Sequence, residues 1–278
     1  MSIDESASGA LCAIPGCNRP AMRSAGIGHA EFHCRYHVQF RARHGSHWHG
    51  TYKAADLKPY LASAAEWINH HRAELPVALS LRGLQGLLDG AGQPEDAQNI
   101  KRRTGAEKAR VAFARLREAG IEAERLLAVH LAVAALIEDD RGSHRAEEFR
   151  QVQTAKALHR LASGTHKGWE WPMPDGTTRP IESHAYPRSS GVVLRVMGRE
   201  LDEICGSVSE FAREVVIALR TEKFGPHPSK LPGWKPEWQV KAEVVSATKG
   251  EVPKNKKPGA GKQGIGRSLK DWLGLPDT

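Results

Sequence analysis

The sequence is poor in aromatic residues, in cysteine and in long apolar stretches. Phe, Trp and Tyr make up 6% of its 278 residues, and only four residues are cysteine. No stretch reaches the roughly 18 consecutive apolar residues that a membrane-spanning helix needs, and no signal peptide precedes residue 12. We therefore expect a cytoplasmic protein with reduced thiols and no membrane partner.

The signatures of several enzyme classes are also missing. The chain has no Walker A motif, no glycine series of a dinucleotide-binding fold, no nucleophile elbow and no kinase signature. These absences disfavour nucleotide-dependent enzymes, dehydrogenases, α/β-hydrolases and kinases. They favour a binding protein over an enzyme.

What the sequence does have is a cluster of metal-binding residue types near its start. Three of the four cysteines fall within residues 12–37, the first two of them around a Pro-Gly turn. The second pair has the C-x₂-H spacing that puts both side chains on one face at the start of a helix. Two short pairs of thiolate and imidazole ligands are typical of a structural Zn²⁺ site with no open position. The predicted ligands are Cys12, Cys17, Cys34 and His37, with His29 and His33 as alternatives for the fourth.

The residues after His37 extend this pattern to C-x₄-C…C-x₂-H-x₃-R-x-R-x-G, which ends at Gly45. The pattern resembles the small zinc modules of HNH endonucleases and of other DNA-binding proteins from phages and mobile elements. The resemblance covers roughly 40 residues and implies DNA association, with Arg41 and Arg43 facing phosphate. The ββα series of catalytic residues in HNH nucleases is not evident, so the resemblance implies binding more than cleavage.

The rest of the chain reads as helices. Ala and Leu dominate the 40% of residues that are apolar, which favours helices over a β-sandwich. The stretch 121–137 is apolar on nearly every side, so we expect the buried centre of a bundle or half of a homodimer interface, with His130 as a core histidine. The predicted helices span residues 54–74, 76–88, 99–119, 121–137, 143–162, 189–205 and 208–219, the last two separated by a break at Gly206.

Positive charge is concentrated in three segments. The net charge is +8, and residues 12–53, 101–118 and 241–278 are each clearly basic while the remainder is acidic. Segregated positive charge indicates a nucleic-acid partner, with an ordinary solvated surface as the alternative. The residues predicted to contact phosphate are Arg35, Arg41, Arg43, Lys101, Arg102, Arg103, Lys108 and Arg110.

The predicted organisation is mainly α. A disordered lead (1–10) precedes a zinc-binding module (11–53) and a multi-helix bundle (54–240), which is followed by a disordered basic linker (241–264) and a docking peptide (265–278). Inside the bundle, 164–188 reads as a long loop that contains a turn and possibly a hairpin. Its Trp169 and Trp171 could stack on bases or plug a core edge, and we favour the core edge. The residues predicted to dock a protein partner are Leu269, Trp272 and Leu273.

Three functions remain open from the sequence. The first is a zinc-stabilised nucleic-acid-binding accessory protein of a phage or mobile element, with DNA as the favoured partner. The second is a divergent metal-dependent nuclease that uses histidines at 44–49 or 70–71, for which Glu66 and His70 form the best pair. The third is a protein-interaction scaffold that uses the zinc module and the C-terminal peptide.

Overall fold

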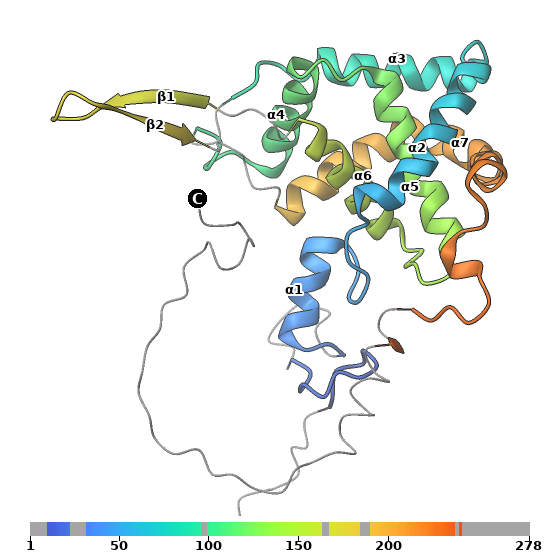
Figure 1. Cartoon of the computed structure of the whole chain (residues 1–278). Coiled ribbons are helices and arrows are strands. Elements are labelled where there is room, and N and C mark those ends of the chain that lie inside the picture. Colours follow the sequence, from blue (N-terminus) through green and yellow to red (C-terminus); the bar gives the residue numbers. More distant parts are fainter. Residues whose placement is uncertain are drawn as a thin grey trace, which may run out of the picture. The chain divides into compact units, whose positions relative to one another are not determined.

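The computed structural model describes residues 10–22, 32–95, 99–162, 167–183, 190–236 and 239–240. Within these ranges the chain is mainly helical, with seven α-helices and one two-stranded sheet (Figure 1), which confirms the predicted fold class. The elements are α1 (Arg35–His44), α2 (Ala54–His71), α3 (Leu75–Asp89), α4 (Gly105–Glu118), α5 (Ala123–Asp139), α6 (Glu147–Leu161), β1 (Lys167–Pro172), β2 (Thr178–Ser183), α7 (Gly191–Phe224) and the 3₁₀ turn η1 (Pro228–Lys230).

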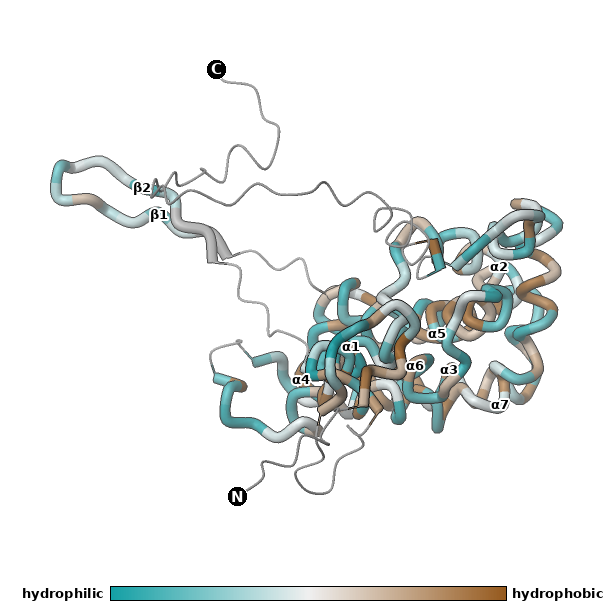
Figure 2. Tube along the Cα trace, turned by 90° about the horizontal axis from the view of Figure 1, so that it is seen from below, coloured by the Kyte–Doolittle hydropathy of each residue, from teal (hydrophilic) through white to brown (hydrophobic). Residues whose placement is uncertain are grey.

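Helix α5 is the centre of the bundle. Fourteen of its 17 residues are buried, and it contacts α2, α3, α6 and α7. Hydrophobic positions gather where α5 runs between the other helices (Figure 2). Helices of the same chain cover α5. This confirms the prediction that residues 121–137 form the buried centre of a bundle.

Helix α7 corrects the prediction of two helices with a break at Gly206. It is continuous over 34 residues, which makes it roughly 50 Å long. A glycine inside a helix costs up to about 1 kcal/mol. The buried stripe of Leu201, Cys205, Val208 and Ala212 on either side of Gly206 outweighs that cost.

Two other helices begin later than predicted because their caps lie further along the chain. Helix α4 starts after Thr104, whose hydroxyl accepts a hydrogen bond from the Glu107 backbone while the Glu107 carboxylate accepts one from Thr104. Residues 101–103 therefore lie in the loop before α4 and not on a helix. Helix α6 starts after Ala146, since the predicted cap Ser143 instead accepts a hydrogen bond from the Tyr52 hydroxyl (2.8 Å).

The stretch predicted as a long loop contains an antiparallel hairpin. Strands β1 and β2 pair from Lys167 with Ser183 to Pro172 with Thr178. Gly176 takes a positive φ of 84° at the turn, and the Asp175 carboxylate accepts hydrogen bonds from the backbone N–H (3.0 Å) and hydroxyl (2.6 Å) of Thr177. A Pro-Asp-Gly sequence favours this geometry, so the region is ordered by its own turn.

The predicted linker and docking peptide in 241–278, including Leu269, Trp272 and Leu273, lie outside the described residues, as do residues 1–9. Among the helices that are described, none combines the length and the apolar character needed to cross a membrane.

Candidate metal centre and basic surface

Cys12 and Cys17 lie on a tight turn that holds both sulfurs on one side. The Cys12 N–H donates to the Arg19 carbonyl (2.9 Å), and the Cys17 N–H donates to the Ile14 carbonyl (3.0 Å). Gly16, between the two, has a φ of 77°. Only glycine adopts this conformation without strain, so Pro15-Gly16 is what allows the chain to reverse between the two cysteines.

Cys34 and His37 come from the start of α1. Cys34 is the N-cap residue of the helix, and His37 lies in its first turn. Burial by itself would raise the pKa of the Cys34 thiol, but the His37 backbone N–H and the neighbouring sulfurs outweigh burial and the pKa is lowered. A helix N-terminus therefore favours the thiolate that a metal needs.

The four predicted ligands are brought together at distances that fit a tetrahedral metal ion. Their ligand atoms lie within 4.8 Å of one another. The Cys17 and Cys34 sulfurs are 3.8 Å apart, and His37 Nδ1 is 3.2 Å from the Cys12 sulfur and 3.5 Å from the Cys34 sulfur. Zn–S bonds of about 2.3 Å and Zn–N bonds of about 2.0–2.1 Å would give about 3.8 Å between sulfurs and about 3.6 Å between sulfur and nitrogen.

The competing explanations of this cluster do not fit its geometry. A disulfide requires sulfurs about 2.05 Å apart, and all three cysteines are free. The His33 ring stacks on His47, with ring centroids 3.6 Å apart, and is not part of the cluster. The other alternative, His29, lies outside the described residues. His37 is therefore the histidine that completes the set.

One carboxylate attaches α1 to the bundle. Glu148 on α6 accepts hydrogen bonds from Arg41 Nε (3.0 Å) and Nη2 (2.6 Å) and from Arg195 Nε (2.8 Å). Burial would raise the pKa of Glu148, but the two guanidinium groups outweigh burial and lower it. Arg41, which the sequence predicts as a phosphate contact, thus has an internal partner 107 residues away.

Side chains from the bundle also cap the C-terminal end of α1. Arg195 donates to the carbonyls of Arg41 (3.1 Å) and Ala42 (3.0 Å), and Gln153 donates to the carbonyl of His44 (3.1 Å). The carbonyls of Ala42 and His44 would otherwise lack a partner at the helix end, and the Arg41 carbonyl also accepts from the Gly45 backbone N–H (2.8 Å). The sequence analysis missed Glu148, Gln153 and Arg195, because nothing in the local sequence signals a partner more than 100 residues away.

The basic residues on α1 differ in how available they are. Arg35 and Arg43 are exposed, and neither has an ion-pair partner within the described ranges. Arg19 lies over the Tyr36 ring, 4.8 Å from its centroid, next to the metal ligands. Arg19 and Arg35 therefore lie beside the metal ligands, whereas Arg43 lies in the last turn of α1, at the end away from Cys34.

The second basic stretch lies before and at the start of α4. Arg103 shares its guanidinium between Glu95 (3.0 Å) and Glu107 (3.3 Å), so its charge is balanced locally. The Lys108 ammonium donates to the Lys101 carbonyl (3.1 Å), a neutral group that does not balance its positive charge. The exposed cations without an ion-pair partner in this part of the described chain are Lys101, Arg102 and Arg110.

These two basic stretches meet at the start of α7. A methyl group on Gly191 would lie 2.0 Å from the Ala42 carbonyl of α1, and one on Gly105 would lie 2.7 Å from Val192 of α7. Arg43 follows Ala42 directly, and Lys101–Arg103 precede Gly105 by a few residues. Segments 60 residues apart in the sequence thus put their cations at one end of the bundle.

The histidines considered for a nuclease do not gather into a second metal site. His44 bonds Thr51 (2.9 Å), and burial lowers its pKa to about 4. The rings of His70 and His71 bond backbone carbonyls of their own helix, and Glu66 pairs with Lys223 and not with His70. Among the described residues, the Cys₃His set is the one group that could hold a metal ion.

Two aromatic residues after α1 pack on the bundle. The Trp48 ring lies 4.3 Å from that of His144, and the Tyr52 hydroxyl donates to Asp140 (3.1 Å). The segment between α1 and α2 is therefore fixed to the helices.

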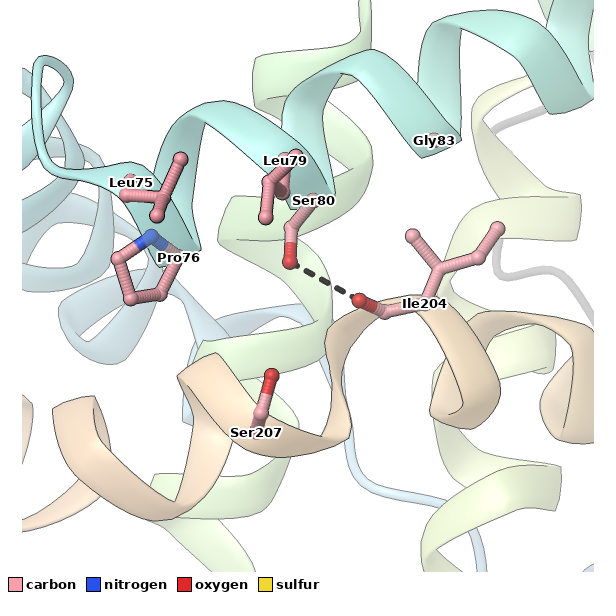
Figure 3. A pocket seen from close by; sticks show the side chains of 7 residues that line it. All are labelled: Leu75, Pro76, Leu79, Ser80, Gly83, Ile204 and Ser207. Carbon is pink, nitrogen blue, oxygen red and sulfur yellow. Dashed lines mark hydrogen bonds between the residues drawn. The ribbon is translucent and has the colours of Figure 1, made fainter.

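An apolar groove lies between α3 and α7 (Figure 3). Leu75 and Leu79 line it and are exposed, and the Ser80 hydroxyl donates to the Ile204 carbonyl (2.9 Å) across its floor. It contains no charged side chain. The groove fits a protein contact and not a metal or phosphate.

Comparison of the chain with protein-family models, with curated proteins and with solved structures gave no match. The resemblance to zinc modules of phage and mobile-element proteins rests on the Cys/His and arginine pattern of residues 12–45.

Proposed function

We propose that the protein is a zinc-stabilised nucleic-acid-binding protein whose favoured partner is DNA. The observation that carries the proposal is the meeting of two separate basic stretches at the start of α7, where the C-terminal end of α1 also lies. The cations available there are Arg43, Lys101, Arg102, Lys108 and Arg110, and Arg35 adds a cation at the other end of α1, beside the metal ligand Cys34. Phosphate contacts of this kind supply affinity by releasing counterions and carry no sequence information of their own.

Zn²⁺ is the metal that suits the donor set. Three thiolates and one imidazole at tetrahedral spacing match a structural zinc site, and reduced cysteines are consistent with it. Bound zinc would cross-link the Cys12–Cys17 turn to the start of α1. With four protein ligands, its contribution is to folding. The phosphate contacts come from this chain's own arginines and lysines.

The role we assign is that of an accessory protein of a phage or mobile element, and this part rests on the resemblance of residues 12–45 alone. The proposal ranks binding above cleavage because His44, His70 and His71 bond to hydroxyl or backbone partners, and no group of described residues besides the Cys₃His set could hold a catalytic metal.

The test is the salt dependence of binding to a labelled DNA duplex, with and without Mg²⁺. For the zinc-loaded protein we expect the logarithm of the association constant to fall linearly with the logarithm of the salt concentration, by about 0.9 for each phosphate contacted. The double variant Arg43→Glu/Arg102→Glu should reduce that slope by about 2 and weaken all sequences equally.

The matched control is Arg141→Glu. Arg141 is exposed, and its backbone N–H bonds the Ser229 hydroxyl (2.9 Å), which places it beyond the far end of α7. The control should leave the slope unchanged. Equal effects of the double variant and the control would overturn the assigned surface, and metal-dependent cutting of the DNA would replace binding with nuclease activity. Absence of binding at low salt would sink the proposal and favour the scaffold.

A further inference from the structure

The hairpin of β1 and β2 presents a pair of tryptophans that the proposed basic surface does not use. Trp169 is 46% exposed and Trp171 is 56% exposed, and neither is part of the hydrophobic core. Of the two roles that the sequence left open, a core edge and base stacking, their exposure contradicts the favoured one, the core edge. Large aromatic side chains that a protein leaves in water in this way mark an interaction site.

The tryptophans share one face of the ribbon, and the charges are sorted between the two faces. Residues two apart on a strand lie on the same face, so Trp169 and Trp171 belong together. The register pairs Trp171 with Arg179, which adds a cation to that face. Glu170 and its partner Pro180 belong to the opposite face, so the acidic residue is separated from the aromatic pair.

The spacing of this face suits bases that are not stacked on each other. Alternate residues of an antiparallel strand are about 6.8 Å apart, twice the rise of about 3.4 Å between stacked nucleotides of a duplex. Two rings at that separation can each stack on one base of an extended strand. Arg179 can pair with a phosphate of the same strand, which is charge complementarity that a basic or neutral partner would not use.

We propose that the Trp169, Trp171 and Arg179 face of the hairpin binds unpaired bases of single-stranded nucleic acid. The proposal rests on the proposed function and makes it narrower. The basic surface at the start of α7 binds any phosphate backbone, and the hairpin prefers strands whose bases are free to stack. The protein should therefore bind a single strand more tightly than a duplex of the same length.

The experiment measures binding of the full chain to a fluorescent oligonucleotide, single-stranded or annealed to its complement, at one fixed salt concentration. The variant is Trp169→Ala/Trp171→Ala. We expect it to bind the single strand at least about 25-fold more weakly, from at least about fivefold for each ring, and to bind the duplex within about twofold of the unmodified protein. Quenching of tryptophan emission by the single strand should disappear with the two rings.

Two further variants control for the fold of the hairpin. Trp169→Phe/Trp171→Phe keeps aromatic faces at both positions and should recover most of the affinity for the single strand. Phe211→Ala removes an aromatic residue that is 61% exposed on α7, and it should leave binding of both oligonucleotides unchanged. The thermal unfolding of the bundle should be the same in the unmodified protein and in both tryptophan variants, since both tryptophans lie outside its core.

The outcomes separate this inference from the proposed function. If the unmodified protein binds both oligonucleotides and the alanine variant binds each of them as tightly as the unmodified protein does, the hairpin assignment is wrong and the basic surface stands. An equal loss for single strand and duplex contradicts the preference for unpaired bases. If the unmodified protein binds neither oligonucleotide, both proposals fail. A tryptophan emission shift with anionic phospholipid vesicles but not with the oligonucleotide assigns the face to a lipid surface and overturns the inference.

Discussion

Cys34 has two roles at once, because its thiol faces the other three ligands while its backbone begins α1. Replacing its sulfur by oxygen keeps the N-cap and removes one metal ligand. We expect Cys34→Ser to lose bound zinc, measured as zinc per protein after gel filtration. Cys205→Ala is the control, since Cys205 is buried in the bundle away from the cluster, and it should retain its zinc. A Cys34→Ser protein with undiminished zinc would contradict the ligand set.

Lys156 connects α6 to the segment after α1, and its environment predicts a pH effect. Its ammonium donates to the Thr51 hydroxyl (2.8 Å) and lies 3.0 Å from His44 Nδ1. Burial, with the nearby charges of Arg160 and Arg195, lowers the pKa of Lys156 from 10.5 to about 8.

Between pH 8 and 10.5 the unfolded chain therefore keeps a proton on Lys156 that the folded chain has released. Stability consequently rises with pH across this window, by about 1–2 kcal/mol after an allowance for the exposed part of the side chain. Lys156→Met should remove that part of the slope, measured by urea unfolding at a series of pH values. Identical slopes for both proteins would show that Lys156 does not titrate in this range.

At the scale of elements, two glycines in α7 give a matched pair of predictions. A methyl group on Gly198 would lie 2.6 Å from the backbone carbonyl oxygen of Gln151 on α6, whereas one on Gly206 would have nothing within 4 Å. Gly198→Ala should therefore force α6 and α7 apart and cost about 1–3 kcal/mol. Gly206→Ala should stabilise the protein by about 0.5–1 kcal/mol, because alanine favours the helix.

Thermal unfolding of the two glycine variants measures whether each substitution raises or lowers the stability of the protein. Destabilisation by Gly206→Ala would mean that α7 bends or opens at the position where the sequence predicted a break. Equal stability of both variants would contradict the close approach of α6 and α7.

The candidate metal ligands could be predicted from the sequence because all four lie within 26 residues and their spacing reflects one turn and one helix start. The helices followed from their periodicity, and their ends were less accurate where a cap such as Thr104 lay inside the predicted span. The exposure of Trp169 and the ion pair of Arg41 with Glu148 could not be predicted. Both depend on which distant segments meet, and residue composition does not record that.

For the whole molecule, the bundle and the zinc module differ in what stabilises them. The residues of the hydrophobic core all belong to the chain from Leu57 onward, whereas α1 is attached through Glu148, Gln153 and Arg195. Removing zinc with a strong chelator should therefore disorder residues 10–22 and 32–44 and leave the cooperative unfolding of the bundle nearly unchanged. Hydrogen exchange and calorimetry before and after chelation measure the two parts. Loss of the main transition with the metal would show that the core needs the module.

The capping of α1 by Arg195 and Gln153 also has a consequence for how the module is inherited. The four candidate metal ligands all lie before α2, so a fragment that ends at residue 53 carries the complete metal site. Cut out at residue 53, however, the fragment would leave behind the donors for the carbonyls of Arg41, Ala42 and His44. A protein that acquired this fragment would need an equivalent carboxylate and arginine on two of its own helices. Without them it would have the metal ligands but not the contacts that hold α1 against the bundle.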